Sequence, residues 1–246
     1  ELIGKGFQKG VLTTPAEVAY LRAFSLERSG SRREALTAYL GIADSPDSYY
    51  GWLATQRLSG LKDAQTQSLI RERTERVNSQ IAAASELYPA PYRQALVRAA
   101  KARGLDPRFI LAIIRQESVF RTFAKSPAGA RGLLQLTIDT AQKYGPAARL
   151  NSLQESDLYR PETSIVVGTE YIAELAQMFP NMLEAVAASY NGGEDNVARW
   201  VKRARLKDPG VVTSEIGFDE TKTYVQRVMS NYRAYRQLYT EDLGRR

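Results

Sequence analysis

The segment Arg108-Phe-Ile-Leu-Ala-Ile-Ile-Arg-Gln-Glu-Ser118 combines the pattern of an amphipathic helix with an acid near its end. Ile110, Ile113 and Ile114 share one helix face, and Glu117 takes the next position on that face. A partly buried carboxyl favours its neutral form, which raises its pKa and prepares it to donate a proton near neutral pH. The alternative is a solvated glutamate at a fraying helix end, and the periodicity alone does not decide between them.

A loop rich in small residues follows, Ser126-Pro-Ala-Gly-Ala-Arg-Gly-Leu-Leu-Gln-Leu136. Gly129 and Gly132 allow backbone geometry and close approach that side chains would block. The polar Gln135 lies between two leucines. Such a loop beside a candidate acid indicates the wall of a cleft, although a plain connecting loop can have the same composition.

The composition excludes several kinds of catalytic site. The 246-residue chain has no histidine and no cysteine. Ser-His and Cys-His nucleophiles, zinc sites of the usual ligand sets and redox cysteines are therefore excluded. Any chemistry must come from carboxylates, Tyr, Lys, Ser or Asn, and we expect neither a cofactor nor a metal.

Two short segments near the start of the chain have the form of helix capping boxes, Thr14-Pro-Ala-Glu17 and Ser31-Arg-Arg-Glu34. In this motif the hydroxyl accepts an early helix amide, and the glutamate reaches back to the cap. The motifs predict two helices separated near Gly30, a pair of tetratricopeptide-like character, although one pair does not establish a repeat array. Their facing apolar positions are Tyr20, Leu21, Phe24, Leu36, Tyr39 and Leu40.

Further helices are predicted on both sides of a proline-rich boundary. Pro89-Ala-Pro91 interrupts helical hydrogen bonding, so we divide the chain into domains 1–88 and 89–246. Gly104 is expected to stop one helix, and Asp106-Pro107 to cap and start the helix that carries Glu117. The segment 120–136 is expected to be irregular, with room for a short β-hairpin. The other helices are predicted near 46–60, 62–84, 91–103, 137–144, 164–178, 181–190, 194–203 and 219–239.

The order and spacing of four motifs resemble the catalytic domain of the soluble lytic transglycosylases, goose-lysozyme-like enzymes that cleave bacterial peptidoglycan. Gln116-Glu-Ser118 resembles the Glu-Ser motif of the family, and Gly132-Leu-Leu-Gln135 resembles its Gly-Leu-Met-Gln motif. Tyr190-Asn-Gly192 resembles its Ala-Tyr-Asn motif. Phe218-Asp-Glu-Thr221, followed by Tyr224, resembles its C-terminal Glu-Thr signature.

The resemblance runs from about residue 91 to residue 239. The segment Tyr49-Tyr-Gly-Trp-Leu-Ala-Thr-Gln-Arg57 also resembles the helical region that precedes the catalytic domain in large soluble members. The resemblance implies a mainly α fold, a helical superhelix segment followed by a lysozyme-like α domain. The chain departs from the family pattern at Leu134, where Met is usual, at Ser189, where Ala is usual, and at Gly217, where Pro is common.

The resemblance also implies roles for individual residues. Glu117 would be the catalytic acid. Side-chain amides both donate and accept hydrogen bonds, so Gln135 and Asn191 can form hydrogen bonds with acetamido groups. Tyr190 would lie close to the catalytic carboxyl, and Glu220 would either position substrate or act through its charge. The full set of implied substrate contacts is Ser118, Ser126, Gln135, Tyr190, Asn191, Glu220 and Tyr224.

Only Glu117 has a convincing setting, whereas glycoside cleavage ordinarily uses two carboxylates. One acid suffices when the 6-hydroxyl of the sugar acts as nucleophile. The resemblance implies this reaction between N-acetylmuramic acid and N-acetylglucosamine, with a 1,6-anhydro product. Two alternatives remain open: hydrolysis of the goose-lysozyme type, with Glu220 or Asp219 holding a water, and a noncatalytic helical scaffold for glycan strands or partners.

The net charge of +7 would suit a polyanionic ligand. The basic residues alternate with acids, as in Arg71-Glu-Arg-Thr-Glu-Arg76, which is typical of a solvated helix face. No nucleic-acid-binding signature is present, so we expect no nucleic acid partner. The positive field instead suits acidic peptide stems of a cell wall. We expect peptidoglycan glycan strands as partners, and the resemblance also allows proteins of wall synthesis or envelope assembly.

No apolar run approaches the roughly 18 residues that a transmembrane helix needs. Glu1-Leu-Ile-Gly-Lys5 does not have the pattern of a signal peptide, so the chain is expected to be a processed or truncated protein. The resemblance implies a periplasmic location.

Overall fold

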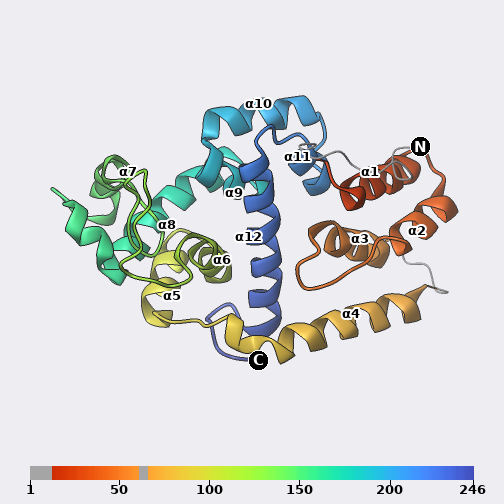
Figure 1. Cartoon of the computed structure of the whole chain (residues 1–246), viewed down its shortest axis with the longest axis horizontal. Coiled ribbons are helices and arrows are strands. Elements are labelled where there is room, and N and C mark those ends of the chain that lie inside the picture. Colours follow the sequence, from red (N-terminus) through yellow and green to blue (C-terminus); the bar gives the residue numbers. More distant parts are fainter. Residues whose placement is uncertain (1–12, 61–65) are drawn as a thin grey trace.

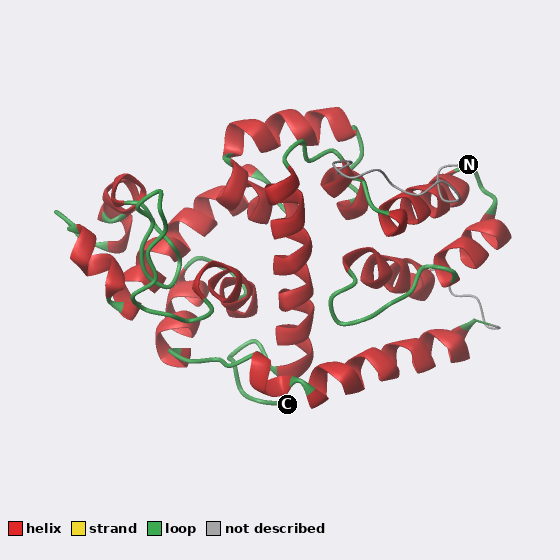
Figure 2. Cartoon of the chain, in the orientation of Figure 1, coloured by secondary structure: helices red, strands yellow, loops and turns green. Residues whose placement is uncertain are grey.

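The computed structural model describes residues 13–60 and 66–246, and within these ranges the chain is built from α-helices, short 3-10 turns and loops (Figure 2). The β-structure of the described residues is confined to isolated bridges. None of the described helices is both long and apolar enough to cross a membrane. The helices are α1 (Pro15–Arg28), α2 (Arg32–Leu40), α3 (Tyr49–Gly60), α4 (Gln67–Ala83), α5 (Arg93–Ala102), α6 (Pro107–Ser118), α7 (Ile138–Tyr144), α8 (Pro161–Met178), α9 (Leu183–Gly192), α10 (Glu194–Ala204), α11 (Pro209–Ser214) and α12 (Asp219–Leu238).

The mainly α fold class is confirmed, and most predicted helices agree with the structure to within a few residues. The helix expected from about Pro46 begins at Tyr49. The start expected near Lys62 lies outside the described residues. Helix α11 was not predicted, although Asp208 caps it by accepting from the Val211 amide at 2.9 Å.

Local signals fix the start of α6, the helix that carries Glu117. Gly104 follows the end of α5, and its φ of +65° lets the Leu105 amide donate back to the Ala100 carbonyl at 2.9 Å. Asp106 then caps α6 by accepting from the Arg108 amide at 2.9 Å. The turn between the two helices is therefore short and well defined.

The two predicted capping boxes are wrong as complete motifs. Thr14 does accept from the Glu17 amide at 3.2 Å, but the Glu17 carboxylate accepts from the Lys222 ammonium at 3.1 Å instead of reaching back. Ser31 makes no side-chain capping bond. The long-range charged partner explains Glu17, since a charge-assisted bond is stronger than a bond to a cap amide.

Helix α12 runs through the middle of the molecule, with α1 to α4 along one side and α5 to α8 along the other (Figure 1). It packs on α6 and α9 on the site-bearing side and on α3 and α4 on the other. Two buried ion pairs join it to the N-terminal half, Lys222 to Glu17 at 3.1 Å and Arg233 to Asp44 at 2.7 Å. Both halves of the chain therefore use α12 as part of their core.

The Glu17–Lys222 pair predicts a large effect on stability. Lys222→Met leaves Glu17 buried without its partner, so the free energy of unfolding should fall by about 3–5 kcal/mol in urea denaturation. The matched control is Lys143→Met, which breaks an exposed pair with Glu174 and should cost less than about 1 kcal/mol. The double variant Glu17→Gln with Lys222→Met should recover part of the loss. Equal losses in both single variants would contradict this prediction.

Candidate active site

Glu117 lies at the C-terminal end of α6, where the chain leaves the helix. Ile110, Ile113 and Ile114 are fully buried, and Glu117 is half-buried at the end of the same face. Val119 and Phe120 have φ values of 48° and 62°, and they turn the chain into the loop that covers the end of the helix. Glu117 lines a cavity of about 770 Å³ together with residues of this loop.

The loop is fixed at Gly132. Its φ is +76°, and a Cβ there would lie 1.9 Å from the carbonyl oxygen of Leu158, so only glycine fits. Two residues later, the Leu134 amide donates to the Ser164 hydroxyl of α8 at 3.1 Å. These contacts anchor the loop against α8 and set the position of Gln135.

Gln135 lines the same cavity, and its amide is held by the backbone. Its Nε2 donates to the Ala124 carbonyl at 3.1 Å and to the Gly132 carbonyl at 2.9 Å. Both of its N–H groups therefore have partners within the loop. The amide oxygen is left as the group that can accept from a ligand.

Tyr224 of α12 donates from its hydroxyl to Glu117 Oε1 at 2.6 Å. The pKa of Glu117 is raised to about 7, and burial is the main cause. The hydrogen bond from Tyr224 lowers this pKa, whereas repulsion from the Glu220 charge raises it further. Because this pKa lies near neutrality, the carboxyl can both give up a proton and take one back. This is the setting that the apolar stripe predicts.

A raised pKa by itself does not identify the acid. Burial also raises the pKa of Glu184 to about 7. That carboxyl is buried at the start of α9, and it accepts from the Tyr49 hydroxyl at 3.3 Å. Glu184 belongs to the contact with the N-terminal helices, whereas Glu117 reaches the cavity.

Tyr190 and Asn191 lie in the last turn of α9, and neither lines the cavity that contains Glu117. The Tyr190 hydroxyl donates to the Leu134 carbonyl at 2.7 Å, so it supports the loop rather than bonding to the acid. Asn191 accepts from the Thr221 hydroxyl at 2.6 Å. A Cβ on Gly192 would lie 2.8 Å from that hydroxyl, so the glycine allows α12 to approach α9 closely. Because the amide oxygen of Asn191 already has this partner, its amide nitrogen is the group that can donate to a ligand.

The two serines of the expected site have different positions. Ser126 lines the cavity, and its hydroxyl accepts from the Ala130 amide at 3.1 Å while remaining able to donate. Ser118 is fully buried, and its hydroxyl donates to the Ile114 carbonyl at 3.2 Å. The expectation that Ser118 contacts substrate is therefore corrected: its side chain faces the core and bonds to its own helix.

A second, smaller cavity of about 380 Å³ lies at the start of α12, and Glu117 does not line it. Gln116, Asp219, Glu220 and Tyr224 contribute to its wall. Glu220 is exposed and makes no bond to Glu117, but its charge acts on that carboxyl. Within residues 13–60 and 66–246, no three His, Cys, Asp or Glu side chains are grouped to hold a metal ion.

Sequence reasoning missed three aromatic residues that line the larger cavity, Tyr92, Phe120 and Phe123. The Phe123 side chain is 81% exposed, and its ring lies 5.7 Å from that of Tyr159. An apolar side chain in a polar loop was the available signal for Phe123. Tyr92 lies far from the motifs in sequence, and no local pattern indicates its place.

A family comparison covers most of these residues. Residues 94–210 match the family model described as the transglycosylase SLT domain. This segment of the chain is therefore similar to a transglycosylase SLT domain. Glu117, Ser126, Gln135, Tyr190 and Asn191 lie inside the matched residues, whereas α12 lies beyond them. The last helix thus contributes Tyr224 to the site from outside the matched segment.

Relatives with similar sequences include proteins named soluble lytic murein transglycosylases. One from Salmonella typhimurium is 32% identical over 155 residues, which are 61% of this chain and 23% of the relative. The chain therefore spans about a quarter of that protein.

Solved structures share the fold over nearly the whole chain. An inactive glutamate-to-glutamine variant of the lytic transglycosylase Slt from Pseudomonas aeruginosa has a TM-score of 0.72 and 25% identity. The match covers 96% of this chain and 48% of that chain. The 70 kDa soluble lytic transglycosylase from Escherichia coli has a TM-score of 0.60 at 22% identity, covering 100% of this chain and 42% of that one. The agreement extends through the N-terminal helices as well as residues 94–210.

The surroundings of Glu117 predict opposite pH shifts in two variants. If the protonated acid is the active form, activity should fall about tenfold per pH unit above a pKa of about 7. Tyr224→Phe removes a hydrogen bond that favours the carboxylate form of Glu117. The pKa of Glu117 should therefore rise, and the decline in activity should begin at a higher pH. Glu220→Gln removes a negative charge that repels the Glu117 carboxylate. The pKa of Glu117 should therefore fall, and the decline in activity should begin at a lower pH. The measurement is the pH profile of kcat/KM.

Tyr232→Phe serves as the control for the pH profiles. It removes a tyrosine hydroxyl from the same helix, one that donates to Asp106 at 2.8 Å and has no contact with Glu117. Its profile should match that of the parent protein. Shifts of the same sign in Tyr224→Phe and Glu220→Gln would refute the assignment of the titrating group.

Proposed function

We propose that this chain is a lytic transglycosylase that cleaves peptidoglycan without hydrolysis. The bond broken is the β-1,4 link between N-acetylmuramic acid and N-acetylglucosamine, and the product carries a 1,6-anhydro end. The observation that carries the proposal is Glu117, a carboxyl with a pKa of about 7 that reaches the cavity and bonds to Tyr224. Among the described residues lining that cavity, it alone is a carboxylic acid.

The proposed reaction uses Glu117 twice. Its carboxylic acid protonates the bridging oxygen, and the bond from that oxygen to the anomeric carbon breaks. The 6-hydroxyl of the same sugar then forms a bond to the anomeric carbon, and the Glu117 carboxylate takes up the hydroxyl proton. Tyr224 orients the carboxyl and stabilises its charged form between the two steps, because its hydroxyl donates to Oε1. The tethered hydroxyl supplies proximity in place of a second carboxylate.

The other side chains would bind and orient the sugars. Gln135 offers an amide oxygen to an acetamido N–H, and Asn191 offers an amide nitrogen to a carbonyl oxygen. Ser126, which also lines the cavity, offers a hydroxyl proton. Tyr190 positions the loop that carries Gln135, because its hydroxyl donates to the Leu134 carbonyl. Glu220 positions substrate and tunes the acid through its charge.

Two findings about relatives support this proposal. The matched relative from Salmonella typhimurium is named a soluble lytic murein transglycosylase. The Pseudomonas aeruginosa structure is that of an inactive glutamate-to-glutamine variant, so a glutamate is essential in that protein. We accordingly propose peptidoglycan as the substrate and the periplasm as the location of this chain, with wall-synthesis or envelope-assembly proteins as further partners.

Glu117→Gln should fold normally and lose turnover. Glutamine keeps the size of the side chain but has no proton to release, so the rate should fall by at least about 10²-fold. Binding to peptidoglycan should persist. The matched control is Glu184→Gln, which changes the other glutamate with a pKa of about 7 and lies away from the cavity. Near-normal cleavage by folded Glu117→Gln would remove Glu117 from the reaction.

Hydrolysis is a second candidate because Glu220 lines the smaller cavity of about 380 Å³ together with Tyr224, and its charge acts on Glu117. As a base for water, Glu220 would be indispensable, and Glu220→Gln should fail as completely as Glu117→Gln. With intramolecular closure, Glu220→Gln should be slowed but still form anhydro ends. Mass spectrometry of the digested peptidoglycan separates the cases. Reducing ends indicate a lysozyme-like hydrolase, and no new ends indicate a noncatalytic scaffold.

We also propose that residues 89–246 form the catalytic unit. The proposed acid and its partners come from α6, the loop after it, α9 and α12, which all lie in this segment. A fragment starting near Ala84 should therefore cleave short glycan strands. Its melting temperature should be lower than that of the whole chain, because Lys222 and Arg233 lose their buried partners. A folded fragment without activity would show that the N-terminal helices are needed for the chemistry.

A further inference from the structure

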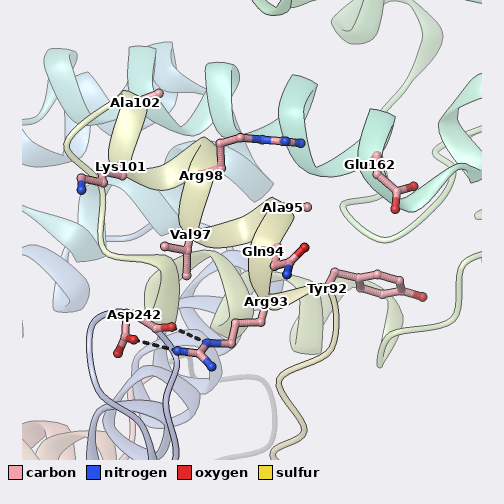
Figure 3. A pocket seen from close by; sticks show the side chains of 10 residues that line it. All are labelled: Tyr92, Arg93, Gln94, Ala95, Val97, Arg98, Lys101, Ala102, Glu162 and Asp242. Atoms are coloured by element: carbon pink, nitrogen blue, oxygen red, sulfur yellow. Dashed lines mark hydrogen bonds and ion pairs between the residues drawn. The ribbon is translucent and has the colours of Figure 1, made fainter.

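A cavity of about 1100 Å³ lies along the exposed side of α5, separate from the cavity at Glu117 (Figure 3). Its walls come from α5, from Glu162 in the first turn of α8 and from Asp242 in the C-terminal segment. We call this cavity the α5 groove. None of the proposed catalytic or sugar-binding side chains lines it.

Tyr92 connects the α5 groove to the catalytic cleft. It lines both the groove and the cavity that contains Glu117. Tyr92 immediately precedes α5, and its φ of 57° is unusual for a residue with a side chain. Backbone held in such a conformation is often found at ligand sites. A branched ligand bound at Glu117 can therefore extend past Tyr92 along α5.

The charges in the groove favour an anionic branch. Arg93 is already paired, because its guanidinium bonds to the Asp242 carboxylate at 2.7 Å and to the Asp242 carbonyl at 2.7 Å. Arg98 and Lys101 are exposed and lie one turn apart on the same helix face. Glu162 on the opposite wall is the remaining acid, so the unpaired groups leave the groove basic.

The groove also has apolar lining residues. Ala95 is buried and Val97 is half-buried, and they project from different sides of α5 (Figure 3). Small apolar side chains of a ligand can pack there, while its carboxylates reach the basic residues. The cavity is at the upper end of the size range of ligand pockets, which gives room for several amino acids.

We propose that the α5 groove binds the acidic peptide stem of the peptidoglycan strand that is cleaved at Glu117. This inference rests on the proposed function. The stem branches from the muramic acid ring beside the bond that breaks, and the groove opens from the cleft at Tyr92. The stem carboxylates bind Arg98 and Lys101, and Glu162 can accept from a stem amine. Arg98 and Lys101 thus set a preference for strands that carry stems.

The test compares two substrates made from the same glycan strands, one with peptide stems and one from which an amidase has removed them. Initial rates are measured for the parent protein and for Arg98→Ala with Lys101→Ala. The parent should have a lower KM for strands with stems. The double variant should raise that KM roughly fivefold, as expected for two exposed charge contacts. Its kinetics on stripped strands should be unchanged, and high salt should weaken the preference of the parent.

The matched control is Arg28→Ala with Arg71→Ala, which removes two exposed positive charges from α1 and α4. It should keep the preference of the parent, which separates a local contact from a general effect of net charge. Charge reversal, Arg98→Glu with Lys101→Glu, should abolish the preference. An unchanged KM ratio in both groove variants, or an equal loss on both substrates, would overturn the inference.

The proposed function and the groove can fail separately in this design. If the parent cleaves stripped strands to anhydro ends but shows no stem preference, the function holds and the groove assignment is wrong. If the parent cleaves neither substrate, the proposed function fails. In that case, binding of soluble stem peptides to the parent and to the double variant, measured by calorimetry, still decides whether the groove takes them. Equal binding by both would contradict the groove assignment.

Discussion

The hydrogen bond from Tyr224 to Glu117 depends on the contact between α6 and α12. The helices packed around α12 keep it in that position. The two residues are 107 positions apart, and their atoms lie 2.6 Å from each other. Helix α12 is held against α6 and α9 on one side and by the buried Lys222 and Arg233 pairs on the other. The position of the candidate acid is therefore a property of the whole fold as well as of its own helix.

Access to the cavity distinguishes the acid from other perturbed groups. Glu117 and Glu184 have pKa values raised to about 7, and in both cases burial is the main cause. Glu184 is enclosed between helices, whereas Glu117 is only half-buried and lines a cavity of about 770 Å³. Desolvation raises the pKa of Glu117, and the cavity beside the loop after α6 makes its carboxyl accessible.

The sequence predicts those features that depend on neighbouring residues. The isoleucine stripe, the Asp106 cap and the stop at Gly104 all act within one or two turns, and the structure has them where they were expected. Contacts between distant segments could not be predicted in this way. Glu17 had the spacing of a capping box but binds Lys222, 205 positions away. Ser118 had the spacing of a site residue but faces the core. For Gln135, the motif indicates the residue type, and the backbone contacts that leave its oxygen free appear only in the structure.

The long separation between Glu117 and Tyr224 also affects how the protein folds. Contacts between residues far apart in sequence close large loops, and their formation is slow compared with that of a single helix. Helix α6 can form early from local signals, with its glutamate still in water and ionised at neutral pH. The glutamate acquires its raised pKa only when α12 docks and excludes solvent. A partly folded chain therefore contains Glu117 as an ordinary carboxylate, and this group reaches the pKa that the proposed reaction needs only when folding is complete.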